Sequence, residues 1–167
     1  NFLGPQRFTD PITYEGDALF TAAPVAAARR GDFLPIVSKE LASLGAPFVA
    51  SWNDYPFNED WIVFFTGLIA RVVGVFGALN LMFLSACVAA ALSMYFVARR
   101  FGVKREGALI AGLLYGVSNF ILNRNVHHYF YIFYFTAPFN ILVSTWLSSR
   151  KGIPFRSKRF SVAAITT

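Results

Sequence analysis

A helical hairpin over residues 107–147 is the feature that most constrains how this chain can fold. Residues 107–122 and 129–147 carry no charged side chain, and they flank the polar tip at residues 123–128. At about 1.5 Å of rise per residue, each run comes close to crossing the roughly 30 Å hydrocarbon core of a bilayer. We therefore expect both runs to span a membrane.

Basic clusters stand outside both ends of this hairpin. They comprise Arg99, Arg100, Lys104 and Arg105 before it, and Arg150, Lys151, Arg156, Lys158 and Arg159 after it. Loops rich in Lys and Arg tend to remain on the cytoplasmic side of a membrane. The pattern therefore predicts cytoplasmic loops at both ends and an external tip.

Composition agrees with a membrane protein. Hydrophobic residues make up 56% of the 167 positions and charged residues only 14%, which is too apolar for an ordinary soluble domain. The net charge of +6 could suggest nucleic acid, but nine of the fifteen basic residues lie in the two predicted cytoplasmic loops. We therefore expect no nucleic-acid partner, and we interpret the single cysteine, Cys87, as a small packing residue.

The expected fold is an all-α integral membrane protein, a multi-pass helical bundle with a large first external loop. Residues 1–60 would form that loop, with short amphipathic helices over residues 17–30 and 34–44. Residues 79–98 would form the first clear span, ahead of spans 107–122 and 129–147. The apolar residues at the C-terminal end resemble the start of a further span, so we expect a fragment of a longer protein.

Residues 61–78 pose the main topological question. Arg71 lies near the middle of this apolar run and shares a small or polar stripe with Gly67 and Gly74. Because an Arg facing lipid costs at least about 2.5 kcal/mol, the helix either lies in the external interface or packs this stripe against protein. Residues 1–60 hold four basic and eight acidic side chains, which favours their placement outside.

Glu15 and Asp17 are the first candidate catalytic residues. On an extended stretch, side chains two positions apart project to the same side. Two such carboxylates can share a hard divalent cation, or one can act as a general base. The alternative is a helix N-cap at Asp17 beside a solvated acid.

The tip supplies the second candidate group, formed by Arg124, His127 and His128. A guanidinium or an imidazolium can bind phosphate, and a neutral imidazole can bind a metal. The alternative is a polar helix cap at the level of the lipid headgroups.

Several short motifs resemble the N-terminal part of GT-C-type membrane glycosyltransferases, a class that includes protein O-mannosyltransferases, aminoarabinose transferases and oligosaccharyltransferase catalytic subunits. They are residues 14–19 (YEGDAL), 45–47 (GAP) with 53–57 (NDYPF), 99–103 (RRFGV) with 107–112 (GALIAG), and 123–128 before an aromatic span containing Pro138. The tip lacks the Arg-x-x-Gly-His form expected from several members.

The resemblance implies transfer of a sugar from a polyprenyl-phosphate donor to an acceptor at the external face of the plasma (inner) membrane. Glu15 and Asp17 would be the catalytic acids, and Arg124, His127, His128 and Asp54 would bind the substrate and its phosphate. A divalent cation, Mg²⁺ or Mn²⁺, would be held by Glu15, Asp17 and His127. The implied partners are the lipid-linked sugar, membrane lipids and an acceptor protein, lipid or glycan. On this basis the fragment alone would be inactive.

Two other classes of function stay open. One is a transporter or lipid-flipping protein, and the other is a non-catalytic membrane scaffold. The sequence contains no G-x-S-x-G, Walker A, H-E-x-x-H, paired C-x-x-C or G-x-G-x-x-G motif, so serine-hydrolase, nucleotide-binding and zinc-site interpretations lack local support.

Overall fold

The computed structural model describes residues 8–12, 17–41, 47–53 and 59–148. It is mainly helical, and it divides into two compact units that we describe separately. The first comprises residues 1–84 with 124–130, and the second comprises residues 85–123 with 131–167. Helix α3 (Val75–Arg100) runs from the first into the second.

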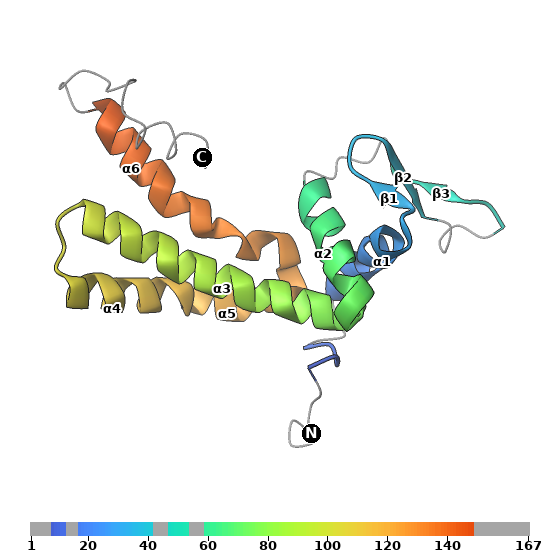
Figure 1. Cartoon of the computed structure of the whole chain (residues 1–167), viewed down its shortest axis with the longest axis horizontal. Helices are drawn as coiled ribbons and strands as arrows, with labels where there is room; N and C mark the ends of the chain where they lie inside the picture. Colours follow the sequence, from blue (N-terminus) through green and yellow to red (C-terminus); the bar gives the residue numbers. More distant parts are fainter. Residues whose placement is uncertain (1–7, 13–16, 42–46, 54–58, 149–167) are drawn as a thin grey trace. The chain divides into compact units, whose positions relative to one another are not determined.

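Helices α1 (Asp17–Arg30) and α2 (Asp60–Val73) form the centre of the first unit, where they lie side by side (Figure 1). Helix α1 starts at the predicted residue and continues through Pro24. It ends at Gly31, whose φ of 92° allows the Gly31 N–H to donate to Ala28 O and the next N–H to donate to Ala27 O. These two bonds satisfy carbonyls that the last helical turn leaves without partners.

A small antiparallel sheet follows α1, so the fold is mainly helical rather than all-α, and the helix predicted over residues 34–44 was wrong. The strands are β1 (Phe33–Leu34), β2 (Ser38–Leu41) and β3 (Ala50–Ser51), in the order β1-β2-β3. Between β1 and β2 the chain turns at Ile36, whose φ of 67° is unusual for a β-branched residue. Phe33 and Leu41 are fully buried. Burial of these two side chains, one from each strand, outweighs the local helical pattern.

Gly74 separates α2 from α3. Its φ of 78° and ψ of 167° stop α2, and its carbonyl accepts the N–H of Ala78 as α3 begins. The predicted run 61–78 and the predicted span 79–98 therefore meet four residues earlier than expected. Helix α3 has 26 residues, a length of about 39 Å at 1.5 Å per residue, which exceeds the core of a bilayer.

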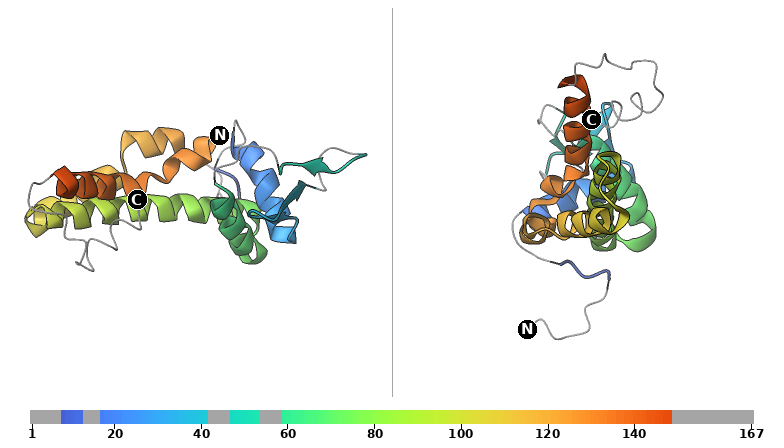
Figure 2. Two further views of the ribbon diagram at one scale, coloured as in Figure 1. Left: turned by 90° about the horizontal axis from the view of Figure 1, so that it is seen from above. Right: turned by 90° about the vertical axis from the view of Figure 1, so that its left-hand side faces the viewer.

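In the second unit, α4 (Arg105–Gly116) packs closely along α3 (Figure 2). A Cβ atom at Gly112 would lie 2.6 Å from Ala91 O, and one at Gly116 would lie 2.7 Å from Cys87 O. Real Cβ atoms do not approach so closely, so these two glycines permit the contact. Cys87 thus lies in a helix-packing position.

The predicted span 107–122 is not one continuous helix. Helix α4 ends at Gly116, and the chain resumes as α5 (Asn119–Arg124), followed by two 3₁₀ segments, η1 (Asn125–Ile132) and η2 (Tyr134–Thr136), and by α6 (Ala137–Ser148). By length and composition, the helical runs Val75–Arg100 and His128–Ser148 could cross a membrane. The wider multi-pass bundle stays a prediction.

The side chain of Tyr134 stabilises the interruption of the helix between α4 and α5. Its hydroxyl donates to Tyr115 O at 2.7 Å and lies 2.9 Å from Ser118 Oγ, while the Tyr115 hydroxyl donates to Tyr134 O at 3.2 Å. In a continuous helix Tyr115 O would accept the N–H of Asn119. At the break it accepts the Tyr134 hydroxyl, together with a longer bond of 3.3 Å from the Ser118 N–H.

Replacing Tyr134 by Phe should therefore lower the free energy of unfolding by about 1–3 kcal/mol, because Tyr115 O loses its shorter hydrogen bond in an apolar setting. Thermal unfolding of the full chain in detergent, followed by far-UV circular dichroism, measures the change. Tyr131→Phe is the matched control, since Tyr131 is 64% exposed and its loss should cost less than about 0.5 kcal/mol. Equal midpoints for the two variants would refute this role of Tyr134.

Candidate functional site

The predicted carboxylates lie at the start of α1 and in the loop before α2. Asp17 is the first residue of α1, and its side chain lies outside the described part of the structure. Glu15 and Asp54 also lie outside the described residues. At the position of Asp17 a carboxylate is favoured electrostatically, because the first turn of a helix presents peptide N–H groups that have no partner within the helix.

The predicted cationic tip is helical, with one sharp change of direction. Arg124 ends α5 with an exposed side chain, and the backbone of His127 belongs to η1. The side chain of His127 lies outside the described part. His128 has φ of −125° and ψ of 63°, which are not helical values, and its side chain is half-buried. The chain therefore bends at His128, directly before Tyr129.

Tyr129 fixes this segment to α2. It is fully buried, and its hydroxyl lies 3.0 Å from Thr66 Oγ1, while the Thr66 hydroxyl donates to Ile62 O at 2.6 Å. Because a threonine hydroxyl has a single proton, Tyr129 must be the donor to Thr66. This buried bond joins residues 63 positions apart in the sequence.

The first compact unit consequently contains Asp17, Arg124, His127 and His128 together, although about 110 residues separate Asp17 from the tip. The structure thus places the start of α1 and the tip in one compact unit.

The alternatives for α2 are resolved in part by its contacts. Gly67 packs against Ala28, and Arg71 Nε donates to Arg29 O at 3.1 Å, at the C-terminal end of α1. Within the stripe, Gly67 thus packs against α1, whereas Arg71 is exposed and contacts the end of α1 and, among the described residues, Gly74 has no neighbour within 4 Å of its Cβ position. On another side of the same helix, Trp61, Phe65 and Val72 are 54%, 53% and 87% exposed.

Polar residues inside apolar runs carry long-range contacts that sequence analysis missed. Asn80 is 6% exposed, and its side-chain amide donates to Phe8 O at 2.7 Å and to Asp10 O at 2.8 Å. Thr66 in α2 likewise makes a long-range hydrogen bond, to the hydroxyl of Tyr129. Their only signal in the sequence is polarity amid apolar neighbours, because a buried polar group needs a partner.

No group of three or more His, Cys, Asp or Glu side chains that could hold a metal occurs within the described ranges. The predicted ligands Glu15, Asp17 and His127 all have side chains outside those ranges. The divalent cation therefore stays a prediction.

Comparisons of the chain with protein-family models, with curated proteins and with solved structures found no match.

Proposed function

We propose that this chain is part of a GT-C-type membrane glycosyltransferase that transfers a sugar from a polyprenyl-phosphate donor to an acceptor at the external face of the plasma (inner) membrane. The observation that carries the proposal is the composition of the first compact unit, which combines the start of α1 with residues 124–130. The buried Tyr129–Thr66 bond supports this grouping.

The chemistry requires two kinds of group in one place. A departing polyprenyl phosphate gains negative charge, which Arg124 with His127 or His128 would stabilise. The acceptor hydroxyl must lose a proton, which the carboxylate of Asp17 would accept with Glu15 as the second catalytic acid, while Asp54 would bind the substrate. If a divalent cation takes part, it would offset charge on the phosphate, and Glu15 and Asp17 provide the hard oxygen ligands that Mg²⁺ and Mn²⁺ prefer.

A membrane surface suits the rest of this unit. The exposed apolar side chains of α2 include Trp61 and Phe65, and aromatic residues are favoured where lipid meets water. A lipid-linked donor could keep its polyprenyl tail in the bilayer while its sugar reaches the carboxylates. This arrangement would place residues 1–60 and 123–128 on the external side.

Asp17→Asn tests the catalytic role. Membranes containing the full-length protein are supplied with polyprenyl phosphates carrying radiolabelled mannose, glucose or aminoarabinose, and release of polyprenyl phosphate is followed as transfer of the label from the lipid to the acceptor. We expect Asp17→Asn to reduce release by about a hundredfold, as for loss of a general base. Asp32→Asn is the matched control, because Asp32 pairs with Arg30 on the surface; it should retain activity. No release by the unmodified protein with any of these donors, or full activity of Asp17→Asn, would contradict the proposal.

Topology gives an independent test. With Cys87 replaced, single cysteines at Thr13, Asn125 and Ser157 are exposed in intact cells to a thiol reagent that cannot cross membranes. The proposal predicts labelling at the first two positions and protection at the third. Protection at Thr13 together with labelling at Asn125 would separate Asp17 from His127 and exclude the site.

A further inference from the structure

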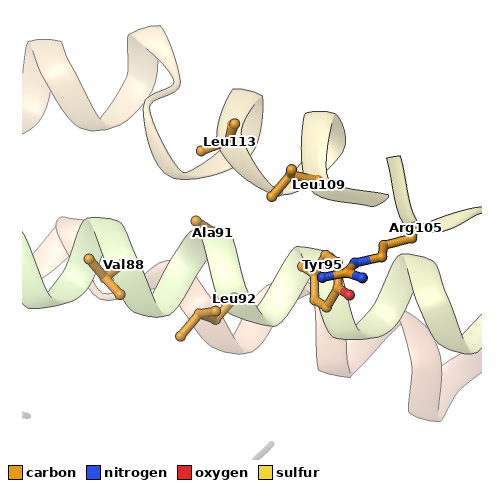
Figure 3. Close-up of a pocket in the computed structure, with 8 residues that line it drawn as sticks. Val88, Ala91, Leu92, Tyr95, Arg105, Leu109 and Leu113 are labelled. Atoms are coloured by element: carbon orange, nitrogen blue, oxygen red, sulfur yellow. The ribbon is translucent and has the colours of Figure 1, made fainter. Parts of the chain in front are cut away.

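A groove runs between α3 and α4 in the second unit. It has a volume of about 440 Å³, and Val88, Ala91, Leu92, Tyr95, Leu109 and Leu113 line it together with Gly112 and Arg105. Figure 3 shows the aliphatic side chains along the groove and the Arg105 side chain at one end, extended toward Tyr95. At Gly112, which is part of this lining, α4 approaches the Ala91 backbone without a side chain between them.

The lining separates sharply into an apolar length and a cationic end. Arg105 is the charged residue of the lining, and within the described part of the chain no carboxylate lies within ion-pair distance of it. Glu106, the next residue, does not line the groove. An apolar groove with a guanidinium at its mouth matches a molecule with a hydrocarbon chain and an anionic head.

The surroundings strengthen the positive end. Arg99 and Arg100 are the last two residues of α3, and Lys104 directly precedes α4. Arg99 donates to Val103 O, and Arg100 lies over the ring of Trp146 at 5.3 Å from its centroid. Arg99, Arg100 and Lys104 do not line the groove, so Arg105 is the cation placed to meet a ligand there.

We infer that this groove binds an anionic phospholipid, with its phosphate at Arg105 and one acyl chain along Leu109, Leu113 and Leu92. Basic residues beside a membrane helix attract anionic headgroups, and the apolar side chains exclude water from the chain. The site requires α3 and α4 to lie in a bilayer. It does not require sugar transfer, so failure of the glycosyltransferase proposal leaves it intact.

Native mass spectrometry of the full chain in detergent tests the headgroup. The probes are phosphatidylglycerol and phosphatidylcholine with identical acyl chains. The unmodified protein should bind phosphatidylglycerol about fivefold more tightly, and Arg105→Gln should abolish this preference. Arg100→Gln removes the same charge from a side chain that does not line the groove, and it should keep the preference. Equal loss in the two variants would show diffuse charge attraction and overturn the inference.

The acyl chain is tested by filling the groove. Leu113→Trp should reduce the binding of both lipids, whereas Leu114→Trp, on a neighbouring position that is 70% exposed and does not line the groove, should leave it unchanged. Circular dichroism checks that both variants keep their helices. Unchanged lipid binding by Leu113→Trp would overturn the inference. A dimer of the chain would also overturn the inference if Leu113→Trp dissociates it and phosphatidylglycerol does not. In that case the groove would hold a second copy of the chain rather than a lipid.

Discussion

Replacing Lys39 by Met is expected to lower the free energy of unfolding of the first unit by about 3–5 kcal/mol. Lys39 Nζ lies 2.7 Å from Asp60 Oδ2, and the two side chains are only 12% and 15% exposed. Without the ammonium group, the Asp60 carboxylate would be left in a poorly hydrated site with no opposite charge. Among the described residues, Asp60 Oδ1 already has no hydrogen-bond partner, and Lys39 is the cation paired with Asp60.

The position of this pair explains why its loss should affect the whole unit. Lys39 belongs to β2, where its backbone N–H donates to Asn53 Oδ1 and its carbonyl accepts the Trp52 N–H. Asp60 is the first residue of α2. The ion pair therefore connects the small sheet to the helix that packs against α1.

Tryptophan fluorescence during urea unfolding in detergent measures the effect, because Trp52 and Trp61 flank the ion pair. A Trp146→Phe background removes the signal of the second unit. Arg30→Gln is the control: the Arg30–Asp32 pair has a similar distance of 2.9 Å but is 45% and 33% exposed, so its loss should cost less than about 1 kcal/mol.

The double variant Lys39→Met/Asp60→Asn separates loss of the pair from the cost of an isolated buried charge. Removing both charges should lower the free energy of unfolding by less than the sum of the losses caused by the two single substitutions. The reason is that the double variant leaves no charged side chain without its partner. Additive losses, or a change of less than about 1 kcal/mol for Lys39→Met alone, would show that water solvates Asp60 and that the pair contributes little.

Local sequence signals located the long helices better than the short elements. The start of α1 at Asp17 followed from a capping residue before an Ala-rich run, and the long apolar run of α3 is helical as expected. The helix predicted over residues 34–44 failed because burial of Phe33 and Leu41 on a sheet overrides a weak local propensity. The end of α2 was misplaced because several glycines could have ended it, and only the structure identifies Gly74 as the residue with positive φ.

The candidate site depends on contacts that local patterns do not encode. Sequence reasoning proposed that the acidic loop and the tip share one face of a membrane, using charge asymmetry alone. The grouping of residues 1–84 with 124–130 rests instead on such contacts as Tyr129 with Thr66, which link distant segments. Neither residue belongs to a motif, so the sequence offered no reason to pair them. The sugar-transfer chemistry itself stays a prediction.

The close contact between α1 and α2 at Gly67 predicts the second large loss of stability. At Gly67 an added Cβ would overlap Ala28 Cβ, and it would lie 2.9 Å from the Ala28 carbonyl carbon and 3.0 Å from the Arg29 nitrogen. Two of these three atoms belong to the backbone of α1, which cannot rotate away as a flexible side chain would. Even one methyl group must therefore push the helices apart.

Gly67→Ala should consequently destabilise the first unit by about 1–3 kcal/mol, although Ala is favoured over Gly in a helix by about 1 kcal/mol. Gly77→Ala is the control, because its Cβ would meet only side-chain atoms, the nearest being Val73 Cβ at 3.3 Å; it should be neutral or stabilising. The same fluorescence assay measures both variants. Separation of the helices would also lengthen the 3.1 Å bond from Arg71 to Arg29 O, so Arg71→Gln should cost less in the Gly67→Ala background than in the unmodified chain. A stabilising Gly67→Ala would mean that α1 and α2 are not in close contact at this position.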